Sequence, residues 1–126
     1  MSLDLIPDVV KSLTGLRCTA ILGVPTCDPS EVAVIYLRIG GIWHRVFVDE
    51  GVPFWVQSDP DPDDDLDGEG EYLDLGVVLD LDETRPELSA VTAVDGTLRI
   101  GFRSIGTLVL SENMQTSGLT LDFEGP

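Results

Sequence analysis

Seven residues between positions 63 and 74 have the types and spacing of a calcium-binding loop. They are Asp63, Asp65, Asp67, Gly68, Glu69, Glu71 and Asp74, at positions 1, 3, 5, 6, 7, 9 and 12 of a DxDxDG pattern. Ca²⁺ takes about six to eight oxygen ligands, and odd spacing about a glycine turn lets one loop surround one ion. In this scheme Glu69 offers its main-chain carbonyl, Glu71 binds directly or through water, and Asp74 completes the shell. One hypothesis is therefore a β-domain that binds Ca²⁺ or is stabilised by it.

Over these twelve residues the chain resembles the loop of an EF-hand, and it departs from that family in three ways. Position 8 is Gly70 in place of a β-branched apolar residue, and position 12 is Asp74 in place of the usual Glu. The flanks are proline-rich on one side and strand-like on the other, so the paired helices of an EF-hand are missing. The resemblance implies a strand–loop–strand ion site. The alternative is a solvated or disordered acidic loop, since a run rich in Asp also matches this pattern by chance.

The same region carries most of the excess negative charge of the chain. The 126 residues include 23 acidic and 7 basic side chains, which give a net charge of −16. Thirteen of the acids and a single base, Arg85, lie within residues 59–87, so this span alone has a net charge of −12. Adaptation to high salt would spread carboxylates over the whole surface. A local concentration attracts cations or a basic protein surface and disfavours nucleic acid and anionic membranes as partners.

A second hypothesis uses this charge without an ion. Acidic side chains steer a basic partner into contact, and neighbouring aromatic side chains anchor it. The residues expected to contact such a partner are Trp43, Trp55, Asp59, Asp61 and Asp64. The concrete form of this hypothesis is a small bacterial, immunity-like protein that neutralises a basic toxin or regulates a basic protein. The alternative is that the charge only maintains solubility and protects strand edges from pairing.

A third hypothesis is a hydrolase that uses His44, the only histidine of the chain, together with a carboxylate. Asp49 and Glu50 lie nearby in the sequence, but no spacing selects either of them. His44 shares a strand face with Ile42 and Val46, which favours a packed, hydrogen-bonded histidine over a general base. Motifs for serine hydrolases, dinucleotides and phosphates are missing from the sequence. A non-enzymatic protein is therefore expected.

Composition and cysteine content favour one soluble domain. Apolar residues make up 43% of the chain, enough to build a core. Cys18 and Cys27 are expected to be free thiols, because two cysteines and one histidine supply no zinc site. The first residues lack a basic leader, and no apolar run has the length of a membrane span, so a cytoplasmic protein is expected.

Short strands must position the residues discussed above. Alternation with a period of two and intervening turn residues predict strands at Cys18–Val24, Val32–Ile39, Ile42–Val48, Pro53–Gln57, Tyr72–Asp82, Leu88–Val94, Thr97–Arg103, Thr107–Ser111 and Leu119–Phe123. Pro7–Thr14 has the pattern of a short helix. Val32–Ile39 is apolar on both faces and is therefore predicted to be a central strand. If one of its faces were exposed, a homodimer would be needed to cover it.

About nine short strands and one N-terminal helix, joined by short hairpins, predict a mainly β fold. We expect one antiparallel domain over residues 1–126, either a sandwich or a partly closed barrel, with an acidic loop at 58–71. An α+β fold is the alternative.

Overall fold

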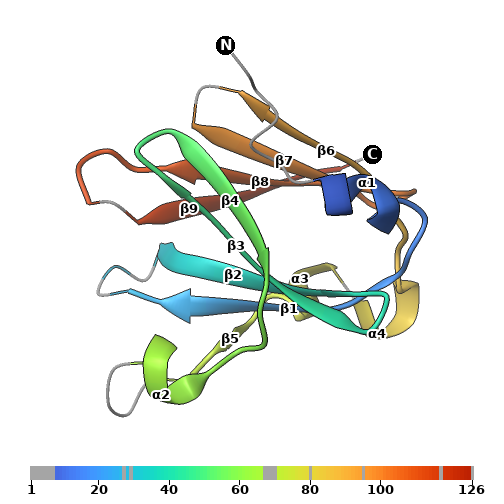
Figure 1. The fold of residues 1–126 in the computed structure, drawn as a ribbon, viewed down its shortest axis with the longest axis horizontal. Helices are drawn as coiled ribbons and strands as arrows, with labels where there is room; N and C mark the ends of the chain where they lie inside the picture. The colour runs from blue at the N-terminus through green and yellow to red at the C-terminus, as the bar shows by residue number, and fades with distance from the viewer. Residues whose placement is uncertain are drawn as a thin grey trace.

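The computed structural model describes residues 8–26, 28, 30–66, 71–79, 81–94, 96–116 and 118–125. Within these ranges nine strands form one antiparallel sheet that is nearly closed into a barrel (Figure 1). The strands are β1 (Cys18–Pro25), β2 (Glu31–Ile39), β3 (Ile42–Asp49), β4 (Val52–Gln57), β5 (Leu73–Asp74), β6 (Leu88–Val94), β7 (Thr97–Phe102), β8 (Gly106–Glu112) and β9 (Leu119–Glu124). The helices in the same ranges are α1 (Asp8–Leu13), α2 (Pro62–Asp65), α3 (Gly76–Leu79) and α4 (Leu81–Thr84). The mainly β, antiparallel prediction is confirmed.

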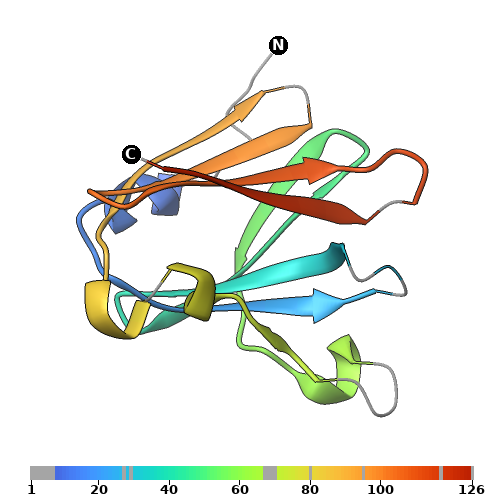
Figure 2. The same cartoon turned by 180° about the vertical axis from the view of Figure 1, so that it is seen from behind.

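Two layers of strands face each other across the core. Figure 2 shows β6–β9 as one layer and β1–β2 as the other, with the β3–β4 hairpin running from the second layer toward the first. The strand order is β4-β3-β2-β9-β8-β7-β6, and β1 occupies the other edge of β2. Between the layers lie fully buried side chains such as Ile21, Leu37, Val46, Ile100 and Leu110. The first junction between the layers is the antiparallel pairing of β2 with β9.

The second junction between the layers is a short backbone pairing that closes the barrel. Arg17, just before β1, pairs antiparallel with Glu87, just before β6. The Cys18 amide donates to the Pro86 carbonyl oxygen at 2.8 Å. β6 therefore begins on the edge of β1, and its remaining length continues into the opposite layer.

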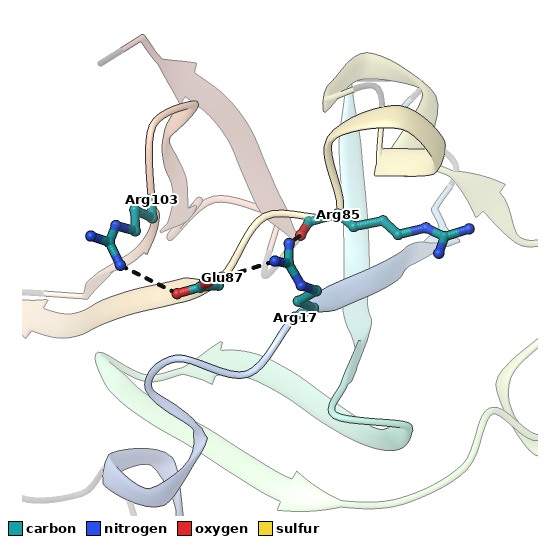
Figure 3. A network of polar contacts seen from close by, with 4 residues as sticks. All are labelled: Arg17, Arg85, Glu87 and Arg103. Carbon is teal, nitrogen blue, oxygen red and sulfur yellow. Dashed lines mark hydrogen bonds and ion pairs between the residues drawn. The ribbon is translucent and has the colours of Figure 1, made fainter.

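Side chains around this junction form a polar network (Figure 3). The Glu87 carboxylate lies between Arg17, with a nitrogen–oxygen distance of 3.8 Å, and Arg103, at 3.4 Å. Arg17 also donates to the Arg85 carbonyl oxygen at 2.7 Å. Because the guanidinium groups are well exposed, each ion pair contributes less than about 1 kcal/mol. The backbone pairing, rather than these charges, closes the sheet.

The strand predicted at Tyr72–Asp82 is wrong. Only β5 is extended, and the chain then forms α3 and α4. The Leu75 amide donates to the Ile21 carbonyl oxygen, and the Cys18 amide donates to the Pro86 carbonyl oxygen, so residues 75 and 86 contact one edge of β1 three residues apart. Three strand residues span about 10 Å, whereas eleven extended residues would span about 36 Å. The intervening chain must therefore be compact, and it folds into short helical turns against β1.

Two tight turns shape the β2–β3–β4 region. Gly40 and Gly41, at the predicted hairpin between β2 and β3, have φ angles of 60° and 82°. Glu50 and Gly51 between β3 and β4 have φ angles of 52° and 78°. Positive φ at both central residues is the signature of a type I′ turn, whose twist matches the strands. The Glu112 carboxylate of β8 accepts hydrogen bonds from both amides of the second turn, each at 2.7 Å, and fixes the hairpin tip to the other layer.

A buried carboxylate joins the β8–β9 turn to the start of β2. Glu31 is 4% exposed. Its carboxylate accepts hydrogen bonds from Asn113 Nδ2 and Thr116 Oγ1, each at 2.7 Å. A Cβ atom at Gly118 would lie 2.4 Å from Glu31 Oε1, so a larger residue there would have to displace the carboxylate. Glu31 thus holds the turn at the junction of the two layers.

We expect Glu31→Ala to lower the free energy of unfolding by about 2–3 kcal/mol, because two donors lose a charged acceptor. Glu31→Gln keeps the volume and one carbonyl oxygen, so we expect a smaller loss of about 1 kcal/mol. Urea denaturation measures both, with Glu71→Ala as the control at an exposed acid. Equal unfolding midpoints for Glu31→Ala and the native chain would contradict this role.

Candidate functional site

The acidic segment, residues 58–74, is attached to the outside of the barrel by apolar side chains and, at its end, by the pairing of β5 with β1. Leu66 and Tyr72 pack against the outer face of β2 at Val34 and Tyr36. The Tyr72 ring meets the Tyr36 ring edge-on, with centroids 5.9 Å apart. β2 is therefore buried on both faces, as its sequence predicts, and the outer face is covered within one chain. No second copy is needed for that purpose.

Several carboxylates of the segment lie outside this apolar contact. Those with described side chains are exposed: Asp59, Asp61, Asp63, Glu71 and Asp74. Asp61 caps α2, because its Oδ1 accepts a hydrogen bond from the Asp63 amide at 3.1 Å. Asp74 Oδ1 accepts a hydrogen bond from the Gly76 amide at 3.0 Å, where the chain turns from β5 into α3. Partial burial of Leu66 and Tyr72, together with exposure of the described acids, makes the segment a negative surface.

The calcium hypothesis stays a prediction. Asp63 lies in α2, Asp74 lies in β5 and Glu71 precedes it, whereas Asp67 and Glu69 lie outside the described residues. The backbone of Asp64 and Asp65 lies in α2, but their side chains are not among those described. Across the ranges that the structure covers, no three His, Cys, Asp or Glu side chains form a group that could hold a metal ion. Thermal melts with chelator, Ca²⁺ and Mg²⁺ test the hypothesis.

The structure places the two tryptophans differently from each other. Trp55 is 2% exposed and faces the core, so the expectation that it contacts a partner is wrong. Trp43 is half-buried on the outer face of β3, beside the start of the acidic segment, where its carbonyl oxygen accepts a hydrogen bond from the Ser58 amide. Phe54 and Val56 of β4 are exposed in place of Trp55.

The pairing register of β3 and β4 explains why Trp55 faces the core while Phe54 and Val56 are exposed. Residues 52–56 are all apolar, so alternation alone does not show which face of β4 turns inward. The two-residue turn at Glu50 and Gly51 pairs Trp55 with Val46, whose side chain faces the core. The type I′ turn was therefore a usable signal, since it sets the pairing and hence the face of every β4 side chain.

His44 is packed in the core, as predicted, but the described residues do not supply the predicted hydrogen bond. The residue is 1% exposed, and its ring centroid lies 5.9 Å from that of Trp55. Neither ring nitrogen has a hydrogen-bond partner within the described part of the chain, and the same holds for Trp55 Nε1. A general base needs an orienting acceptor and access to substrate. The geometry supplies neither in the region described, so it does not support a hydrolase.

Burial lowers the pKa of His44, because the charged imidazolium loses hydration in the core. The unfolded chain therefore binds more protons than the folded chain as pH falls below about 6.5, and stability declines with acidity there. We expect this decline to be absent in His44→Leu. The stability of the native chain relative to His44→Leu, measured by urea denaturation, should be lower at pH 5.5 than at pH 7.5. A difference that is constant with pH would contradict burial of a neutral His44.

Cys18 is a free, fully buried thiol. Burial raises its pKa to about 12, so the reactive thiolate is scarce at neutral pH. Its Sγ donates to the Ala20 carbonyl oxygen at 3.6 Å. Cys18 is therefore a core residue, as its place in a strand suggests, while Cys27 lies outside the described residues.

No family model, curated protein or solved structure matches the chain. Within the part that the structure describes, no helix has the length and apolar character needed to cross a membrane. The chain is defined by its fold and its surface: a nearly closed antiparallel β-barrel with an attached acidic segment.

Proposed function

We propose that the chain is a non-enzymatic binding domain that docks on a basic protein through its acidic segment. The observation that carries this proposal is the attachment of the segment by Leu66 and Tyr72, which leaves the carboxylates of Asp59, Asp61 and Asp63 in solvent. A folded protein face with one sign of charge favours a partner of the opposite sign. Neutralisation of a bacterial toxin-like protein is the concrete form of this proposal.

The distribution of basic residues supports the same proposal. No Lys or Arg occurs between Arg45 and Arg85, so the acidic segment contains no cation of its own. Two arginines of the opposite layer have acidic partners there: Arg99 contacts Glu124 at 2.6 Å, and Arg103 contacts Glu87 at 3.4 Å. Arginine charge in the opposite layer is thus partly balanced locally, whereas the acidic segment has no Lys or Arg within its own sequence.

Charge of this kind predicts how docking responds to salt. The Debye length is about 8 Å at physiological ionic strength, so carboxylates in solvent act on a partner before contact. They raise the association rate and select against acidic partners, while adding little affinity individually. Solubility alone explains a high net charge but not the position of that charge on one attached segment.

We expect Asp59→Asn combined with Asp63→Asn to weaken binding of a lysine–serine peptide about threefold at low salt. The reason is the loss of two solvent-facing carboxylates, each with an interaction of about 0.2–1 kcal/mol. The double variant should also show a smaller dependence of affinity on salt, measured by titration calorimetry at several ionic strengths.

The matched control is Glu83→Gln combined with Asp122→Asn, which removes two exposed charges outside the segment. We expect this control to retain most of the affinity of the native chain. An equal loss in both double variants would show a response to net charge alone and would remove the acidic segment from the proposal.

A further inference from the structure

The outer side of the β3–β4 hairpin carries an exposed apolar surface next to the acidic segment. We define the aromatic face as Trp43, Phe47, Phe54 and Val56. Phe47 and Phe54 are cross-strand partners whose rings stack, with centroids 4.8 Å apart and an angle of 13° between the planes. Phe54 is 38% exposed and Val56 is 47% exposed. The face therefore offers large apolar side chains on a paired, ordered element.

The acidic segment covers only part of this outer surface. Its apolar residues Leu66 and Tyr72 pack where β1 and β2 meet, in a cluster that also includes Trp43 and Phe47 as half-buried members. Phe54 and Val56, on β4, continue the same surface and stay exposed. The boundary between covered and exposed surface thus runs along β3.

Acidic side chains lie at both ends of the strand that presents this surface, and Arg45 of β3, the cross-strand partner of Val56, places its guanidinium 5.2 Å from the centre of the Phe47 ring. The chain leaves β4 at Gln57, the Ser58 amide donates to the Trp43 carbonyl oxygen at 3.1 Å, and the exposed Asp59 follows at once. At the opposite end of β4, Asp49 is the last residue of β3 and Glu50 lies in the turn, and both are also exposed. Acidic side chains therefore precede and follow the strand that presents Phe54 and Val56.

We propose that the aromatic face is the apolar anchor site of the docking surface, and that its occupant is a protein segment with apolar side chains flanked by Lys or Arg. This proposal rests on the proposed function and names the chemistry of the partner more closely. Charge complementarity selects the occupant, because an apolar segment without basic flanks would not use the acids at either end of β4. A second copy of the chain is disfavoured, since each copy carries a net charge of −16 and would bring its own acidic segment to the same place.

Apolar burial and charge have separate roles in this arrangement. Burying a phenylalanine-sized side chain changes affinity about tenfold or more, whereas one exposed ion pair changes it by less. Aromatic side chains dominate interface energetics when the contacts around them exclude water. Affinity should therefore depend on Phe54 and Val56, and salt dependence on the acidic segment.

Two peptides of equal charge separate these roles: one alternates lysine with leucine, and the other alternates lysine with serine. We expect the native chain to bind the lysine–leucine peptide about tenfold more tightly than the lysine–serine peptide at one fixed ionic strength, measured by titration calorimetry. Phe54→Ser combined with Val56→Ser should reduce this ratio to about one and leave the affinity for lysine–serine unchanged. The matched control is Val77→Ser with Val94→Ser, which replaces side chains 74% and 62% exposed elsewhere and should keep the preference.

The outcomes distinguish the two proposals. If neither peptide binds at low salt, the proposed function is wrong and this inference is wrong with it. If both peptides bind the native chain equally, only this inference is overturned. A preference that survives in the Phe54 and Val56 variant, or disappears in the control, also overturns it.

Amide chemical-shift mapping of the native chain provides a second test that needs no variant. The lysine–leucine peptide should shift the amide signals of Phe47, Phe54 and Val56, and the lysine–serine peptide should shift mainly those of the acidic segment. Leucine-specific shifts at Val77 or Val94 instead would overturn the inference. A dimer of the native chain in high salt that the Phe54 and Val56 variant does not form would also overturn it, because a second copy would then be the occupant.

Discussion

Burial of β2 on both faces is the constraint on which the other elements depend. Its inner side chains, including Leu37 and Ile39, form the barrel core, whereas Val34 and Tyr36 point outward and need a separate cover. The acidic segment supplies that cover with Leu66, at its middle, and Tyr72, near its end. Because an unpaired carboxylate is costly to bury, the described carboxylates of the segment lie in solvent. The packing of β2 therefore determines where the negative surface lies.

Alternation in the sequence was sufficient to identify the strands of the barrel, and it failed where pairing depends on distant residues. The apolar positions of Tyr72–Asp82 alternate well, yet only β5 is extended. The edge of β1 available to this stretch is limited by the pairing of Arg17 with Glu87, which closes the barrel. That closure is a non-local contact, and no local pattern in residues 72–82 reports it. The acidic character of this stretch was evident from the sequence, but its compact path was not.

The position of the negative charge in the candidate site is predictable from the sequence, whereas the identity of its exposed apolar residues is less so. The concentration of acids within residues 59–87 is visible in the sequence, and the described carboxylates of residues 58–74 are exposed. Trp55 was misplaced, because aromatic content does not show which face of a fully apolar strand turns inward. His44 shows a related limit. Alternation predicts its burial, but the lack of a hydrogen-bond partner among the described residues depends on which side chains surround its ring.

The β3–β4 hairpin and the acidic segment suit different parts of molecular recognition. The inner face of the hairpin is fixed by Trp55 in the core, and its tip is fixed by the Glu112 carboxylate. Short-range apolar contact loses affinity when its surface shifts by about an ångström, so a paired hairpin is the better platform for it. Charge acts over about a Debye length and tolerates variation in position, so a connecting segment is adequate for it. Because the acids follow β4 directly, short-range apolar contact and longer-range charge act at one surface. The charge does not require the acidic segment itself to be rigid.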